Sequence, residues 1–255
     1  NNSPIDIDKL IEGTNEILTA NRNSLQLFDM LHSMRQFDDL TYVHSVNVAL
    51  IASILGQWLK FSEKDIRILT ISGLLHDIGK IMIPNEILTK PGKLTVAEYN
   101  IMKQHVNFGY EKVKNQNIDI RIKEACLLHH EKCDGTGYPF GLKSDHIPAV
   151  AKIIAIADVY DAMTSARVYR GALCPFEVID TMYKDAFTKF EPEYILPFLK
   201  NVASSYINND VRLSDGRIGK VVLINENALS LPIVQCEDEF IDLSKTRELT
   251  VSAIL

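Results

Sequence analysis

Side chains that can bind metal ions fall at five places along this chain. The most conspicuous is the adjacent pair His76-Asp77, which follows an apolar run and precedes Gly79 and Lys80. The complete set comprises His44, His76, Asp77, His105, His129, His130 and Asp158. Imidazoles offer nitrogen ligands and a carboxylate can bridge, so the set suits two divalent transition metals that share a ligand. Because five of the seven histidines belong to it, the sequence predicts a metal centre.

The HD pair itself suggests how the ligands are divided. Adjacent helical residues diverge by about 100°, so His76 and Asp77 would serve neighbouring positions rather than one point. We therefore expect Asp77 to bridge two metals. His44, His76 and Asp158 would surround the first, and His105, His129 and His130 the second. Mixed nitrogen and oxygen ligation leaves iron, manganese, zinc, nickel and cobalt all open.

Helices must hold these residues in place. Apolar spacings of three and four predict helices over about 41–59, 66–77, 120–131, 150–166, 175–189 and 192–206. Ser62 with Asp65, and Thr95 with Glu98, resemble capping arrangements that start two helices. The first would carry His76-Asp77 to a stop at Gly79, and the second would carry His105 in its later turns.

The last part of the chain has a different pattern. A hairpin around Asp215-Gly216 and three further apolar segments, about 231–236, 240–243 and 249–255, predict strands. We expect a helical lead-in over 1–38, a catalytic domain over 39–208 and a small β-rich subdomain over 209–255. Packing against the helices, dimerisation and ligand sensing are the roles open to that subdomain.

Composition excludes several classes of protein. A net charge of −6 and a pI near 5.7 argue against DNA binding through a broad basic surface. The uncharged runs are too short for a membrane span. The four cysteines show no CxxC spacing and are expected to be reduced thiols. These features predict a cytoplasmic protein.

Two longer motifs carry a family resemblance. The sequence reads HDIGK from 76 to 80 and HHEKCDGTGYP from 129 to 139. It thereby resembles the HD-GYP family of metal-dependent phosphohydrolases over about residues 40–200. The resemblance implies a mainly α fold, a helical HD-domain bundle, to which the β-rich appendix is added at the C-terminus. It also implies hydrolysis of cyclic di-GMP to pGpG, and in some members on to GMP.

The resemblance assigns roles to individual residues. The seven ligands named above match the family's ligand positions, and Asp77 and Lys80 become the expected catalytic residues, with a hydroxide held between the metals as nucleophile. Lys80, Arg167 and Arg170 fall where the family contacts substrate phosphate, although a solvated helix end is the other interpretation of the arginines. We expect iron or manganese first, with zinc, nickel and cobalt open. From its spacing after Asp158, Asp161 is expected to orient a histidine or arginine.

Two features of the motif region remain to be interpreted. Gly137, Tyr138 and Pro139 either shape the rim of the pocket, which we favour, or form a docking surface for a diguanylate cyclase (GGDEF) partner. Family members with a third metal have a glutamate four residues before the first histidine. That position is Leu40 here, with Asp39 one residue out of register, so we predict two metals and no third.

Two other functions stay open. Residues that read the base cannot be identified, so the substrate could be another cyclic dinucleotide such as a mixed cyclic GMP-AMP. A module that senses cyclic di-GMP or docks a partner without turnover is the second alternative. The oligomeric state, including a homodimer, also stays open.

Overall fold

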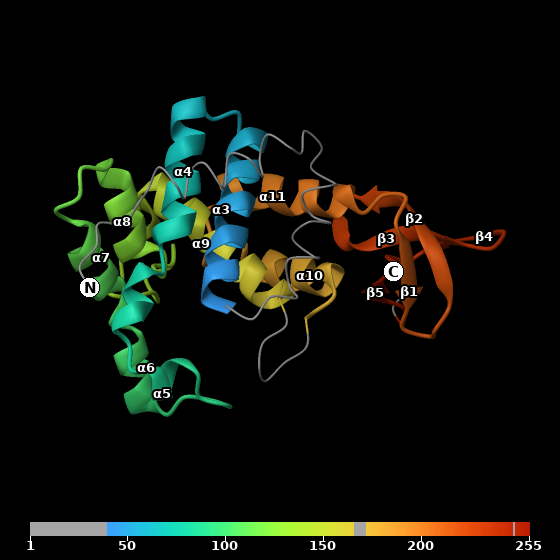
Figure 1. The fold of residues 1–255 in the computed structure, drawn as a ribbon. Helices are drawn as coiled ribbons and strands as arrows, with labels where there is room; N and C mark the ends of the chain where they lie inside the picture. The colour runs from blue at the N-terminus through green and yellow to red at the C-terminus, as the bar shows by residue number, and fades with distance from the viewer. Residues whose placement is uncertain (1–39, 166–171, 247) are drawn as a thin grey trace. The chain divides into compact units, whose positions relative to one another are not determined.

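The structure, a computed structural model, describes residues 40–165, 172–246 and 248–255 (Figure 1). In chain order its elements are α3 (Leu40–Trp58), α4 (Glu63–Leu75), η1 (Ile78–Met82), α5 (Asn85–Leu88), α6 (Val96–Met102), α7 (His105–Val113), α8 (Ile120–Leu128), η2 (Ser144–His146), α9 (Ala149–Thr164), α10 (Pro175–Asp185), α11 (Pro192–Ser205), β1 (Asp210–Leu213), β2 (Ile218–Asn225), β3 (Ala228–Cys236), β4 (Glu239–Asp242) and β5 (Val251–Ile254). The predicted fold class, mainly α with a β-rich C-terminal appendix, is confirmed. The predicted lead-in over 1–38 lies outside the described residues.

The chain groups into two compact units. The first contains the described residues up to Ala162 together with Thr188–Glu191, and the second contains Met163–Phe187 and Pro192–Leu255. The predicted boundary at residue 209 separates helices from strands, whereas this grouping places α10 and α11 with the sheet. The extent of an independent catalytic domain therefore stays a prediction.

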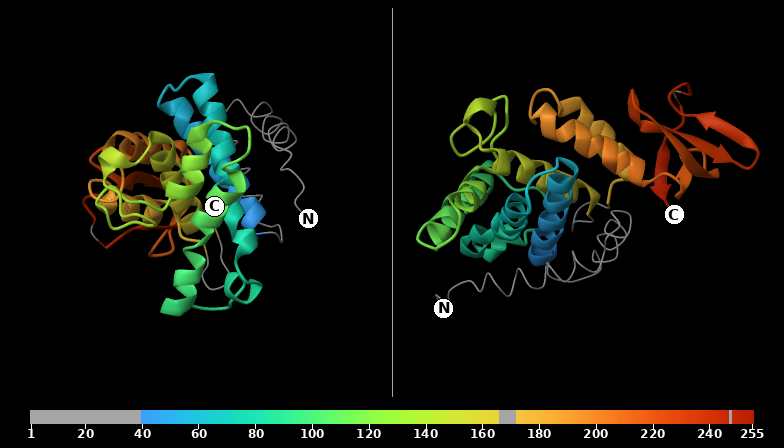
Figure 2. Two further views of the ribbon diagram at one scale, coloured as in Figure 1. Left: turned by 90° about the vertical axis from the view of Figure 1, so that its left-hand side faces the viewer. Right: turned by 90° about the horizontal axis from the view of Figure 1, so that it is seen from above.

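Helices α3, α4 and α8 form the centre of the first unit. They lie side by side, with α4 in contact with both of its neighbours (Figures 1 and 2). The approach of α3 to α4 is close, because a Cβ on Gly73 would lie only 2.5 Å from the Cα of Ala49. Most side chains of α3 from Val46 to Leu55 are buried. This packing brings His44 near the start of α3 toward the end of α4.

The HD pair lies at the end of α4 rather than inside a helix. Ser62 caps α4 as predicted, with its hydroxyl accepting from the Asp65 backbone N–H. The helix then stops at Leu75, earlier than predicted. His76 is the last residue with helical backbone angles, and Asp77 has φ −98° and ψ 9°, which starts the 3₁₀ turn η1. This change of direction lets two adjacent side chains converge, which a continuous helix would not allow.

His105 also lies at a helix boundary. The predicted capping box of Thr95 and Glu98 is present, but α6 ends at Met102 and His105 begins α7. The prediction that His105 sits in later turns of one helix was therefore wrong. No glycine or proline marks this break in the sequence. The 3₁₀ turn η1 packs closely against this break, since a Cβ on Gly79 would lie 1.9 Å from the His105 carbonyl oxygen.

The second unit combines two amphipathic helices with an antiparallel sheet. The strand order is β4-β3-β2-β1-β5, and both α10 and α11 contact β3. The predicted turn at Asp215-Gly216 joins β1 to β2, and Gly216 has a φ of +93°, which favours glycine. The predicted strands are therefore present, with boundaries shifted by a few residues.

Among the described helices, none is long and apolar enough to cross a membrane.

Candidate metal centre

Four imidazoles are held in the same way. The Nδ1 atom of each lies within hydrogen-bond distance of an oxygen: Asp161 Oδ2 for His44 (2.7 Å), Gly73 O for His76 (2.7 Å), Met102 O for His105 (2.7 Å) and Ala125 O for His129 (2.9 Å). A carbonyl oxygen can only accept, so the last three rings donate through Nδ1. Their Nε2 atoms are then left with a free lone pair, which is the form that binds a metal.

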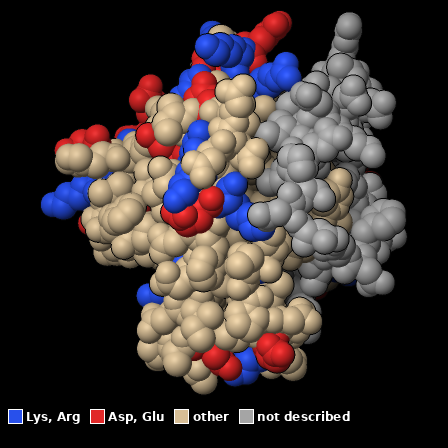
Figure 3. Space-filling model, turned by 60° about the vertical axis from the view of Figure 1, so that its left-hand side comes forward, with Lys and Arg blue, Asp and Glu red and all other residues tan. Residues whose placement is uncertain are grey.

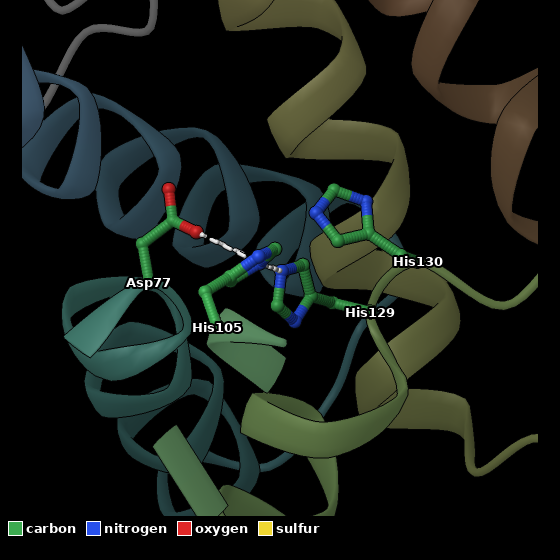
Figure 4. Close-up of side chains that lie close together, drawn as sticks. All are labelled: Asp77, His105, His129 and His130. Atoms are coloured by element: carbon green, nitrogen blue, oxygen red, sulfur yellow. Dashed lines mark hydrogen bonds and ion pairs between the residues drawn. The ribbon is translucent and has the colours of Figure 1, made fainter. Parts of the chain in front are cut away.

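The Nε2 atoms converge on Asp77, whose side chain is buried. One carboxylate oxygen, Oδ2, lies 3.3 Å from His76 Nε2 and 3.6 Å from His44 Nε2. The other, Oδ1, lies 3.4 Å from His105 Nε2 and 3.9 Å from His129 Nε2. Figure 4 shows Asp77 with His105, His129 and His130 turned toward one another. A carboxylate that faces imidazoles with both oxygens is placed as a bridging ligand would be.

Three overlapping sets of residues bring their ligand atoms within 4.8 Å of one another. The sets are Asp77, His105, His129 and His130; His44, His76 and Asp77; and His76, His129 and Asp158. The first set matches the predicted division. The second contains two of the three ligands predicted for the other metal, and the third groups Asp158 with ligands predicted for both metals.

Two buried atoms test whether a metal fits here. Asp77 Oδ1 and His76 Nε2 have no hydrogen-bond partner among the described residues. Leaving a buried polar atom unsatisfied costs about 1 to 3 kcal/mol, and a cation between these atoms would remove that cost. With nitrogen and oxygen donors in one buried cluster, the residues fit a divalent metal site.

His105, His129 and His130 form what we call the imidazole side of the centre. Burial lowers the pKa of His105, and burial together with the neighbouring His130 and His76 holds the pKa of His129 well below its usual range. Burial also lowers the pKa of His130 to about 4. These rings are therefore neutral near pH 7, as metal ligation requires.

His44, Asp158 and Asp161 form the carboxylate side. Burial lowers the pKa of His44, but hydrogen bonds to Asp158 and Asp161 outweigh it and raise that pKa to about 9. His44 Nε2 lies 3.0 Å from Asp158 Oδ1. Burial opposes ionisation of Asp158, yet the contact with His44 holds its pKa well below the usual range. The side is thus rich in negative charge that a cation would neutralise.

Asp161 makes the contact expected of an orienting residue, because its Oδ2 accepts from His44 on the carboxylate side. Its other oxygen accepts from Asn47 Nδ2 at 2.8 Å. Asn47 was not among the site residues predicted from the sequence. Its signal was a polar residue one helical turn after His44 in an otherwise apolar segment.

The predicted phosphate contacts are only partly described. Lys80, on η1, donates to Asp77 Oδ2, and its side chain is 22% exposed, so its ammonium borders the cluster. Arg167 and Arg170 lie outside the described residues, as does Asp39. Leu40 begins α3, and the expected absence of a third metal stays a prediction.

The segment from Gly137 to Leu142, which we call the GYP loop, is held by the carboxylate of Glu131 and by a ring contact with His130. The carboxylate of Glu131 is buried and accepts from the backbone N–H groups of Phe140 (2.7 Å), Gly141 (3.1 Å) and Leu142 (2.9 Å). The Tyr138 ring stacks on His130, with centroids 4.7 Å apart. Gly137 allows the loop to approach, since a Cβ there would lie 2.5 Å from the Glu131 Cα. Glu131 lies within the motif at 129–139, but no role was predicted for it from the sequence.

Comparison with known proteins places this geometry in a family. The model of the HD domain matches residues 12–194. The chain belongs to the HD domain family. It is 36% identical over 203 residues to a cyclic di-GMP phosphodiesterase of Pseudomonas aeruginosa, covering 79% of this chain and 49% of that protein. It is also 36% identical over 173 residues to a 3′3′-cGAMP-specific phosphodiesterase of Vibrio cholerae, covering 67% of this chain and 38% of that one.

A solved structure supports the fold of this HD domain chain. An HD-GYP-type protein of Bdellovibrio bacteriovorus superposes with a TM-score of 0.60 at 21% identity, over 75% of this chain and 60% of that one. The resemblance predicted from the HD and GYP motifs is confirmed by the HD domain model and by the curated relatives. The chain spans about half the length, or less, of the two curated relatives described above.

Proposed function

We propose that this protein is a metal-dependent phosphodiesterase that hydrolyses cyclic di-GMP to pGpG. The observation that carries the proposal is the buried cluster in which both oxygens of Asp77 face imidazole Nε2 atoms. A relative that matches most of this chain is named as a cyclic di-GMP phosphodiesterase. Hydrolysis of a phosphodiester needs a nucleophile at neutral pH and a means to stabilise charge on phosphoryl oxygens, and both can come from such a centre.

The chain's residues divide the work as follows. His44, His76 and Asp158 would hold one divalent metal, the imidazole side would hold a second, and Asp77 would bridge them. Such ions supply a water of lowered pKa and neutralise charge on the attacked phosphate. Lys80, beside Asp77, would neutralise a phosphoryl oxygen, and Arg167 and Arg170 would add bidentate contacts.

Other residues keep this arrangement rigid. Asp161 fixes the direction of the His44 ring, because its carboxylate accepts from Nδ1, and Nε2 would bind the metal once its proton is released. Glu131 ties the loop after the GYP motif to the end of α8. Tyr138 covers one face of His130, which limits the access of bulk water to the imidazole side.

The test is turnover under defined metal conditions. The protein is purified anaerobically, loaded with Fe(II) or Mn(II), and incubated with cyclic di-GMP while pGpG and GMP are separated by chromatography. Elemental analysis of the same sample gives the identity and number of metals, for which we expect two ions, iron or manganese. A chelated sample is the control. Binding of cyclic di-GMP without product in either metal would instead support a sensing module.

A second substrate has specific support. The relative whose name specifies 3′3′-cGAMP is as similar, at 36% identity, as the cyclic di-GMP phosphodiesterase. Identity therefore does not separate the two substrates. Parallel reactions with cyclic di-GMP, 3′3′-cGAMP and cyclic di-AMP, compared by kcat/KM, decide between them.

Partner binding is a further prediction for this chain. Phe140, next to the GYP motif, is 63% exposed. The projection formed by α5 and α6 shows few charged side chains (Figure 3), and it exposes Val96 and Ile101. These apolar side chains suit a GGDEF partner or a second copy of the chain. Size-exclusion chromatography with light scattering, with and without a diguanylate cyclase, tests both. A cytoplasmic location likewise stays a prediction.

A further inference from the structure

Lys103 is a partly buried cation next to the metal centre. It follows α6 and lies two residues before His105. Its Nζ atom is 5.3 Å from the centre of the Tyr99 ring and 6.0 Å from the centre of the Tyr138 ring. Both distances fall within the range of a cation–π interaction. The ammonium is thus held by two aromatic rings.

No carboxylate of the described residues neutralises the charge of Lys103. Two earlier lysines, Lys80 and Lys90, differ in this respect, since they pair with Asp77 and Glu98. No ion pair joins Lys103 to any described acidic side chain. A cation held near a binding site without a protein counter-ion remains able to pair with an anionic ligand.

The position of Lys103 relative to the centre follows from the aromatic contacts. Tyr138 contacts both Lys103 and His130, because its ring stacks on the imidazole of His130 and its centre lies 6.0 Å from Lys103 Nζ. Its ring centroid is also 6.5 Å from that of His105. Lys103 therefore borders the imidazole side, one aromatic ring away from the ligands. Tyr99, the other ring that holds it, is 49% exposed, so this site is open to solvent.

A cyclic dinucleotide presents a second anionic phosphate, which a cation beside the metal centre can bind. It carries two phosphodiesters, each with one negative charge, and only one is cut in the first step. Lys80 stands beside Asp77, where the reacting phosphate would lie. We propose that Lys103 binds the phosphate that is not being cut, and so positions the substrate. This inference rests on the proposed function.

The alternative role for Lys103 is purely structural. In that case its ammonium would only brace Tyr99 and Tyr138, and its loss would loosen Tyr138 over His130. Such a change would reduce metal content and would impair hydrolysis of every phosphodiester equally. A substrate-positioning role instead affects only substrates that carry a second phosphate.

The test compares cyclic di-GMP with bis(p-nitrophenyl) phosphate, which has a single phosphodiester. In the Mn(II)-loaded protein, Lys103→Gln keeps much of the side chain and removes the charge. We expect its KM for cyclic di-GMP to rise about tenfold, with kcat, metal content and bis(p-nitrophenyl) phosphate hydrolysis unchanged. Lys103→Arg should restore most of the affinity. Lys93→Gln, an exposed lysine on the segment between α5 and α6, is the matched control and should resemble the unaltered protein.

Each outcome decides one question. An unchanged KM in Lys103→Gln, or an equal loss with both substrates together with loss of metal, would overturn the role of Lys103 while leaving the proposed function intact. If the unaltered protein cleaves bis(p-nitrophenyl) phosphate but no cyclic dinucleotide, the proposed function fails, and the assignment of Lys103 fails with it.

Discussion

The imidazole side and the carboxylate side of the metal centre flank the same aspartate but differ in charge. On the imidazole side three neutral rings face Asp77, and the nearest other carboxylate oxygen is Asp158 Oδ2, 3.8 Å from His130 Nδ1. On the carboxylate side His44 lies between Asp158 and Asp161. A divalent ion gains more Coulomb energy next to two carboxylates than next to one. We therefore expect the carboxylate side to bind its ion more tightly once His44, whose pKa is about 9, has released the proton that the ion replaces.

The two sides also differ in what holds their imidazoles. His105 and His129 are anchored by main-chain carbonyls of Met102 and Ala125, whereas His44 is anchored by the side chain of Asp161. A main-chain anchor depends on the helix ends and cannot be removed by substitution. A side-chain anchor such as Asp161 can be removed by substitution. The carboxylate side is therefore where a single substitution can tune metal affinity without moving a ligand.

The largest effect is expected from Asp77, which both sides share. In Asp77→Asn the neutral amide has the same shape but cannot balance the charge of two ions, so we expect loss of both metals and activity at background. Elemental analysis and cyclic di-GMP turnover measure this. Asp145→Asn, at an exposed carboxylate, is the control for loss of one negative charge. Retention of both ions by Asp77→Asn would show that Asp77 does not bridge.

A pair of ligand substitutions separates the two sides. His129→Ala should lose the ion of the imidazole side and keep the other, while His44→Ala should do the reverse. Each variant should be inactive, because both ions act on one phosphate. An ion that binds only the folded protein stabilises it, by about 2.7 kcal/mol at a hundred times its Kd. Mn(II) should therefore raise the melting temperature of each variant less than that of the unaltered protein. Loss of both ions in both variants would mean that the sides are not independent.

The fold class followed from the sequence because it depends on residue type and periodicity, and the candidate ligands, which the structure brings together, were predicted from residue type. Buried apolar residues set the helices, and the HD and GYP motifs contain four of the seven candidate ligands, His76, Asp77, His129 and His130. The sequence could not show that α4 ends at Leu75 or that His105 begins a helix, since neither break is marked by glycine or proline at that position. Both breaks depend on packing, as the contact of Gly79 with the His105 carbonyl shows.

Contacts between distant residues were also hidden from the sequence. Asn47 and Asp161 are 114 residues apart and meet only after α3 and α9 pack. Glu131 belongs to a recognisable motif, but its role required the loop that folds back onto it. Lys103 has no motif at all. Each of these residues supports the centre from outside the ligand set, where residue type alone carries little information.

Asp161→Asn should have an intermediate effect restricted to the carboxylate side. The amide oxygen can still accept from His44 Nδ1, but the negative charge that strengthens the imidazole as a ligand is lost. Substitutions of this kind lower metal affinity by about 10- to 100-fold. Competition with a metal chelator, followed by elemental analysis, should show weaker retention of one ion and unchanged retention of the other. Equal weakening of both ions would contradict the division of the centre into two sides.

The smallest effect is expected from Asn47, which acts through Asp161. In Asn47→Ala the Asp161 carboxylate loses a hydrogen bond of 2.8 Å between buried groups, at a cost of about 1 kcal/mol in the free energy of unfolding. Denaturant unfolding of the metal-free protein measures this. Chelator competition should show a smaller loss of affinity than in Asp161→Asn. Because the two residues act in series, adding Asn47→Ala to Asp161→Ala should change metal affinity little further. A full additional loss would mean that Asn47 supports the ligands by a route that does not pass through Asp161.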